Sequence, residues 1–110
     1  MIDFFKAPKV YIASPYTLGD VGVNVKRQHL AFQDLIELGY NPHAPLLLHY
    51  QHIHYPLDYQ ACIDYTMSWL EVCDIVLRLP GESSGADGEV KRAIELGLPV
   101  YYDLNDLPKL

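Results

Sequence analysis

The apolar and polar positions near the C-terminal end of the chain predict a strand–helix–strand unit. Residues 74–79 form an almost wholly apolar run, residues 99–103 form a second one, and the helix-length segment 85–97 lies between them. Short buried strands separated by a helix are typical of a parallel βαβ unit. Ligands of such sheets bind at the carboxyl ends of the strands. We therefore expect the loop at residues 80–84 and the start of the following helix to border a binding site.

One residue of the predicted helix breaks its amphipathic pattern. When the residues are placed at about 100° intervals, the apolar side chains share one arc and charged side chains such as Lys91 and Arg92 lie opposite. Glu89 falls between Ala93 and Leu96, at the edge of the apolar stripe. A carboxylate there costs solvation free energy unless something compensates it, and such residues are frequent at functional sites. An edge glutamate can also extend to water, so the helical geometry leaves both interpretations open.

The same periodicities assign most of the remaining chain. Residues 9–14 form a β-branched and aromatic strand, and residues 40–44 form a weaker one whose proline suits an edge position. Residues 23–38 and 58–73 have helical spacing. The apolar face expected for the first helix consists of Leu30, Ala31, Leu35 and Leu38, and Asp58 is the expected N-cap of the second. Residues 45–57 fit neither period and are expected to be a functional loop or lid. Because strands and helices alternate, the pattern predicts an α/β fold with a parallel sheet.

Length and charge limit the classes of function. A chain of 110 residues with 50% hydrophobic composition forms one domain, residues 1–110, with a substantial core. The net charge of −6 argues against a nucleic-acid polymer or an anionic membrane as a partner, although it permits a nucleotide held by local contacts. No GxGxxG or Walker A sequence follows the first strand, so neither a dinucleotide fold nor a P-loop nucleotidase is supported.

The cysteines and the absence of leader-like sequence indicate a cytoplasmic protein. Cys62 and Cys73 are expected on one helix, about 16 Å apart at 1.5 Å per residue, which is beyond the reach of a disulfide. They are therefore expected to be thiols in a reducing compartment. The sequence contains no signal peptide and no apolar run long enough to span a bilayer.

Several polar side chains are candidates for ligand contact at the carboxyl edge of the sheet. Ser14 and Tyr16 place hydroxyls just after the first strand, although ordinary turn chemistry would also explain them. Arg78 is unexpected in an apolar strand, where it could bind a phosphate, hold a carboxylate or form a structural ion pair. Ser84 is expected to cap the next helix, whose bare amides form an anion site with Ser83.

The histidines are concentrated in the predicted lid. His49, His52 and His54 lie within it, and His43 immediately precedes it. Their spacing fits no standard metal site, so no metal is expected. A histidine here could stack on a base or transfer a proton, or these could be polar loop residues.

Four stretches of the chain carry a resemblance to a known family. They are VYIASPYT, a helix that ends in LGY, a helix that contains WLEVCD, and the run IVLRLPGESSGADGEVKRAIELGLPV. Together they span roughly residues 10–102 and resemble the nucleoside 2-deoxyribosyltransferase-like superfamily, most closely its small bacterial and phage members. The most specific element is S-x-G-x-x-x-E-x-x-x-A, formed here by Ser83 or Ser84, Gly85, Glu89 and Ala93.

This resemblance implies a structure and a reaction. The structure is a three-layer, flavodoxin-like or Rossmann-like sandwich with four to five parallel strands in the order of about 2-1-3-4. The family needs no metal or other cofactor, and a neighbouring subunit often completes its site, which implies a homo-oligomer such as a dimer or tetramer. Glu89 matches the family glutamate that attacks the anomeric carbon of the sugar and expels the base, after which a second base or water takes the glycosyl group.

One position departs from the family pattern. The aspartate that assists the leaving base is matched here by Thr66, and Asp64 would point elsewhere on a regular helix. The proton for the base is therefore expected from Asp64, Tyr16 or a loop histidine, unless the chemistry differs or is lost. Glu89 and Asp64 are the predicted catalytic residues. The predicted substrate-binding residues are Ser14, Tyr16, Thr66, Arg78, Ser83, Ser84 and Gly85.

We therefore expect cleavage or transfer of the N-glycosidic bond of a nucleoside or nucleoside 5′-monophosphate, which would be the small-molecule partner. Glu89 would be the nucleophile, because a carboxylate beneath the anomeric carbon stabilises an oxocarbenium-like transition state. Two other functions remain open. The domain could bind nucleotides without cleaving them, as a sensor, or it could hydrolyse the glycosidic bond of a dinucleotide such as NAD.

Overall fold

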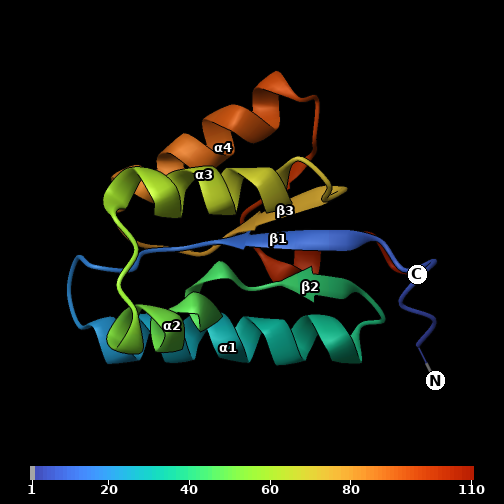
Figure 1. Ribbon diagram of the computed structural model, residues 1–110. Helices are drawn as coiled ribbons and strands as arrows, with labels where there is room; N and C mark the ends of the chain where they lie inside the picture. Colours follow the sequence, from blue (N-terminus) through green and yellow to red (C-terminus); the bar gives the residue numbers. More distant parts are fainter. Residues whose placement is uncertain (1) are drawn as a thin grey trace.

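Four parallel strands form a single sheet with helices on both faces (Figure 1). This computed structural model describes residues 2–110. The strands lie in the order β2-β1-β3-β4, and their bounds are β1 (Lys9–Ala13), β2 (Asn41–His43), β3 (Ile75–Arg78) and β4 (Val100–Tyr101). The predicted α/β class, the parallel sheet and its strand order are all confirmed.

The helices divide between the two faces of the sheet. Helix α1 (Val21–Glu37) covers one face, whereas α3 (Tyr59–Leu70) and α4 (Ser84–Glu95) cover the other (Figure 1). The short helix α2 (His49–His54) lies on the α1 side, at the left in Figure 1. None of the helices within residues 2–110 combines the length and apolar character needed to cross a bilayer.

The two faces of β1 explain why its sequence is an unbroken apolar run. Successive side chains of a strand point to opposite faces. Val10 and Ile12 pack in the core beneath α1, while Tyr11 and Ala13 pack in the core beneath α3 and α4. All four are fully buried. A parallel strand covered on both sides has no solvent-facing position for a polar side chain.

The buried face of helix α1 matches the expected one only in part, at Ala31 and Leu35. Leu30 and Leu38, which the periodicity assigns to the apolar face with Ala31 and Leu35, are 57% and 50% exposed. The buried residues of the helix are Asn24, Gln28, Ala31 and Leu35. Their i, i+4, i+7, i+11 spacing is regular, but two of them are polar, so hydrophobicity alone placed the face incorrectly.

Two other expectations need correction. The predicted lid contains a 3₁₀-helix (Pro45–Leu48) followed by α2, because Pro45 suits a first helical turn, where its missing N–H is not needed. The cap of α4 is Ser83 instead of Ser84: Ser83 is extended, and its side chain accepts a hydrogen bond from the amide of Ala86. Asp58 caps α3 as predicted, through the amide of Ala61.

Because all four strands are parallel, their carboxyl ends meet at one edge of the sheet. The loop after β1, the loop after β3 and the first turns of α3 and α4 all lie at this edge, on the left in Figure 1. This is the edge where ligands of open α/β sheets bind.

Candidate functional site

Glu89 points toward the central strand of the sheet and not into bulk water. It lies in the second turn of α4, is partly buried, and its carboxylate accepts a hydrogen bond from the hydroxyl of Tyr11. Tyr11 is on β1 and is fully buried. Of the two orientations that the helical geometry allowed, the structure therefore has the inward one.

Burial strongly changes the acidity of this carboxyl group. Loss of solvation raises the pKa of Glu89 to about 8, because the charged form is disfavoured away from water. The hydroxyl of Tyr11 acts in the opposite direction, since a donated hydrogen bond stabilises the carboxylate. A carboxyl group that exchanges its proton near neutral pH is a common feature of catalytic sites.

A row of aromatic rings continues from Tyr11 along the α3 face of the sheet. His43 on β2 is the register partner of Tyr11, and their ring centroids are 5.7 Å apart. Trp69 of α3 stacks on His43 with centroids 5.2 Å apart and planes at 20°. Burial lowers the pKa of His43, and within residues 2–110 its Nε2 atom is buried without a hydrogen-bond partner. His43 is therefore held as a neutral ring among other rings.

A second polar pair lies at the carboxyl edge of the sheet. The hydroxyl of Tyr16, just after β1, is 2.5 Å from Nδ1 of His49, the first residue of α2. Their rings meet edge to face, with centroids 5.5 Å apart. Burial raises the pKa of Tyr16, and the thiol of Cys62 on α3 adds to the effect. The structure thus joins a predicted ligand-contact tyrosine to one of the lid histidines.

Two buried amide side chains of α1 hold this edge in place. The Nε2 atom of Gln28 donates to the carbonyl of Ile12 and to Oγ of Ser14, while its Oε1 accepts from the amide of Leu46. The Nδ2 atom of Asn24 donates to the carbonyl of Tyr16 at 2.9 Å. The segments that carry Tyr16 and His49 are therefore both fixed to one helix.

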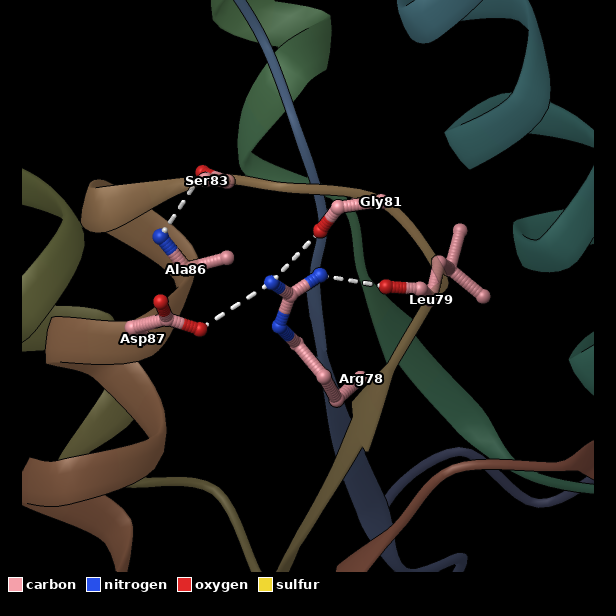
Figure 2. Close-up of polar contacts among 6 residues, drawn as sticks. All are labelled: Arg78, Leu79, Gly81, Ser83, Ala86 and Asp87. Carbon is pink, nitrogen blue, oxygen red and sulfur yellow. Dashed lines mark hydrogen bonds and ion pairs between the residues drawn. The ribbon is translucent and has the colours of Figure 1, made fainter.

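Arg78 is the centre of a separate hydrogen-bond cluster (Figure 2). Its guanidinium group donates to the carbonyls of Leu79 and Gly81 and pairs with Asp87, with 3.1 Å between Nη2 and Oδ1. The Arg78 side chain is 9% exposed. Of the roles expected for Arg78, the structure contains the ion pair, and contact with a substrate stays a prediction. The cluster ties the loop after β3 to the first turn of α4.

Two shallow cavities adjoin this cluster. One has a volume of about 390 Å³ and the other about 310 Å³, and both are lined by Arg78, Asp87 and Tyr102. The larger is also lined by Val90 and Ile94. On the helical circuit these residues lie on the opposite side of the buried stripe of α4 from Glu89. The cavities and Glu89 therefore occupy different flanks of the same helix.

The remaining predicted site residues have mostly structural partners. Ser14 is buried against Gln28, and Ser83 caps α4. The hydroxyl of Thr66 donates to the carbonyl of Ile63 one turn earlier. Asp64 is exposed and accepts from Gln60 at 2.9 Å, so it faces solvent on α3. Two predicted residues are exposed at the start of α4, namely Ser84 and Gly85.

The histidines do not assemble into a single cluster. His43 stacks in the aromatic row, His49 pairs with Tyr16, and the ring of His54 lies 4.6 Å from that of Tyr50. Across residues 2–110, no three His, Cys, Asp or Glu side chains group in a way that could hold a metal ion.

Sequence reasoning missed Tyr11, Asn24 and Gln28 as parts of this site. For Tyr11 a signal was available, because a tyrosine in the most buried strand needs a partner for its hydroxyl. For Asn24 and Gln28 the signal was their spacing of four residues, in step with Ala31 and Leu35.

Comparison with known proteins identifies a family and a shared fold. A protein-family model described as Domain of unknown function (DUF7768) matches residues 8–103. Among solved structures, the chain is similar to a 2-deoxyribosyltransferase from the psychrotolerant bacterium Bacillus psychrosaccharolyticus, with a TM-score of 0.62 and 22% identity. That alignment covers 84% of this chain and 69% of the other. No curated protein matches the chain.

Proposed function

We propose that this chain, which belongs to the DUF7768 family, cleaves or transfers the N-glycosidic bond of a nucleoside or nucleoside 5′-monophosphate. The observation that carries the proposal is the partly buried, inward-pointing Glu89 carboxyl group, hydrogen-bonded by the fully buried Tyr11 at the centre of the sheet. The fold that it shares with a 2-deoxyribosyltransferase, and the S-x-G-x-x-x-E-x-x-x-A residues at the start of α4, support a distant membership of that enzyme superfamily.

In the proposed reaction the ionised carboxylate of Glu89 attacks the anomeric carbon. The electron pair of the bond between that carbon and the base leaves with the base, which takes a proton. The glycosyl group stays bound to Glu89 until water or a second base attacks the same carbon and releases the carboxylate. Tyr11 fixes the orientation of the carboxylate through its hydrogen bond. Partial burial of Glu89 strengthens the attraction between the carboxylate and the developing positive charge on the sugar.

The start of α4 suits the other end of the substrate. Ser84 and Gly85 are exposed there, and the first amides of a helix attract a 5′-hydroxyl or 5′-phosphate group. Within the proposed superfamily, a neighbouring subunit would complete this site, so we expect a homo-oligomer.

The first experiment measures base release directly. Purified wild-type protein, Glu89→Gln and the control Glu37→Gln are incubated with a panel of nucleosides and nucleoside 5′-monophosphates, and the free bases are separated by chromatography. We expect wild-type protein and the Glu37 variant to release base at equal rates, and Glu89→Gln to lose at least about 1,000-fold, because the amide cannot form the ester intermediate. Glu37 is exposed and is the last residue of α1, at the edge of the sheet opposite the carboxyl ends of the strands. Base release by Glu89→Gln at the wild-type rate would refute the proposal.

The geometry of Thr66 favours one alternative. Its hydroxyl donates to a helix carbonyl, so it does not replace the aspartate that the resemblance places there. A domain without a proton donor would bind nucleotides as a sensor. In that case a nucleotide should raise the melting temperature while no free base accumulates, and release of nicotinamide from NAD would instead indicate a dinucleotide hydrolase.

A further inference from the structure

We propose that Tyr16 donates the proton that the leaving base requires, and that His49 supplies that proton to Tyr16. This inference rests on the proposed function above and names the residues that complete it. Three lines of geometry carry it: the direct contact of the two side chains, the anchoring of both segments, and their place at the carboxyl edge of the sheet, where α4 with Glu89 also begins.

The contact between the two residues allows proton transfer. The hydrogen bond between the Tyr16 hydroxyl and Nδ1 of His49 gives a proton a direct path between the two side chains. Both side chains are partly exposed at the carboxyl edge of the sheet, so the pair faces the region where ligands of such sheets bind.

The pair is rigidly built, which favours a positioned catalytic group over an incidental surface contact. Asn24 holds the carbonyl of Tyr16, and Gln28 holds the amide of Leu46, three residues before His49. These amides are 7% and 1% exposed, so the anchors are buried. Fixing a proton donor in advance removes the entropy cost of placing it during the reaction.

The first turns of α3 and the loop after β3 connect the pair to the Glu89 side of the sheet. Cys62 lies close enough to Tyr16 to contribute to its raised pKa, and Thr66 follows Cys62 by one turn on the same helix face. Trp69 continues that face and stacks on His43, beside the Tyr11 that binds Glu89. A Cβ atom at Gly81, just before α4, would lie only 2.7 Å from Pro15, the residue before Tyr16.

Tyr16 is also placed to replace the aspartate that the resemblance expects at Thr66. Thr66 stands where the resemblance places the residue that assists the leaving base, yet its hydroxyl is turned to Ile63, while Asp64 faces solvent with Gln60. Tyr16 lies just after β1, at the same edge of the sheet as the first turn of α3. Of the three expected proton sources, the structure joins Tyr16 to the loop histidine His49, whereas Asp64 faces solvent.

In the proposed step a proton passes from His49 through Tyr16 to the base. In the reacting form, His49 donates its Nδ1 proton to the oxygen of Tyr16, whose own proton points to the base. As the glycosidic bond breaks, its electron pair passes to the base, and a ring nitrogen of the base takes the Tyr16 proton. The Tyr16 oxygen takes the Nδ1 proton, leaving neutral His49. The incoming water or base returns one proton along the same path.

The test compares two leaving groups. A purine nucleoside needs a proton on its base, whereas 4-nitrophenyl ribofuranoside or its 2-deoxy form releases a nitrophenolate that needs none. General acids contribute about 100- to 10,000-fold, so we expect Tyr16→Phe and His49→Gln to lose that much purine release while they cleave the nitrophenyl substrate at nearly the wild-type rate. Glu89→Gln should lose both activities. Tyr55→Phe and His29→Asn, both at exposed positions, should lose neither.

His49 acts through Tyr16, so its role needs a readout that lost packing would not reproduce. That readout is the ratio of the purine-release rate to the nitrophenyl-cleavage rate, which His49→Gln should lower, whereas a general loss of packing should lower both rates alike. Melting temperatures show whether each variant is folded.

The results separate the two proposals. Equal losses on both substrates in folded Tyr16→Phe and His49→Gln, or unchanged purine release, would refute the proton-donating pair while Glu89 remains the nucleophile. Wild-type protein that cleaves neither substrate, or Glu89→Gln that still cleaves both, would refute the proposed function and the pair with it.

Discussion

At the scale of single residues, Glu89 has an energetic cost that depends on pH. Its pKa is about 8 in the folded protein, whereas an exposed glutamate has a pKa of 4.5. Between these values the unfolded chain releases a proton that the folded chain keeps. Stability associated with Glu89 is therefore fully present below about pH 4.5 and is lost as the pH rises through 8.

This leads to a stability prediction that does not depend on activity. Relative to wild-type protein, Glu89→Gln should be nearly equal in free energy of unfolding at pH 5 and more stable at pH 9 by roughly 3–4 kcal/mol, because the loss is about 1.4 kcal/mol per pH unit. Urea denaturation of both proteins from pH 5 to 9 measures the difference. Glu37→Gln is the control for an exposed glutamate. A difference that stays constant over this range would mean that Glu89 is not buried as described.

The same group sets the expected pH dependence of the reaction. A nucleophilic carboxylate must be ionised, so the rate with the nitrophenyl substrate should rise with pH and level off above about pH 8. Initial rates measured from pH 5.5 to 9.5 would show this rise and the plateau above it. A rate that is flat across that range would contradict a nucleophile with the pKa of Glu89.

At the scale of structural elements, the loop between β3 and α4 depends on one glycine. Gly81 has φ of 118°, in the region that favours glycine, and an added Cβ would meet Pro15 at 2.7 Å. The carbonyl of Gly81 also accepts from Arg78 (Figure 2). This backbone geometry and the close approach to Pro15 bring the loops after β1 and β3 together.

Gly81→Ala should therefore destabilise the protein by roughly 2–3 kcal/mol, since both the backbone strain and the contact with Pro15 oppose it. Gly88→Ala is a matched control in the middle of α4, where an added Cβ meets nothing within 4 Å. It should stabilise the protein by about 0.5–1 kcal/mol, because alanine favours helix more than glycine does. Midpoints of urea unfolding measure both. Equal effects of the two changes would show that the loop accommodates a side chain at residue 81.

The elements also show where periodicity is informative and where it is not. Periodicity found β1, β3 and α4, because a continuous apolar run or an amphipathic stripe leaves few alternatives. It misplaced the face of α1, since Asn24 and Gln28 are buried for the hydrogen bonds they make. Those bonds go to residues distant in sequence, such as Leu46, and no local pattern encodes them.

At the scale of the whole molecule, the sheet order followed from a resemblance of motifs together with the alternation of strands and helices, and the structure confirms it. The inward orientation of Glu89 could be suspected from its helix alone, but its partner could not. Tyr11 lies 78 residues away in sequence and meets Glu89 only because α4 packs over β1. The pairing of Tyr16 with His49 likewise depends on how α2 returns to the end of β1.

The side chain of Gln28 has a consequence for how a ligand reaches this edge of the sheet. It joins β1 to the amide of Leu46, so the start of the segment that carries α2 cannot swing away without leaving buried polar groups unpaired. Any gate must open further along, at residues 55–58, which connect α2 to α3 and include no helical residue. Ligand entry would then depend on movement of the linker at residues 55–58, while α2, which carries His49, stays in place.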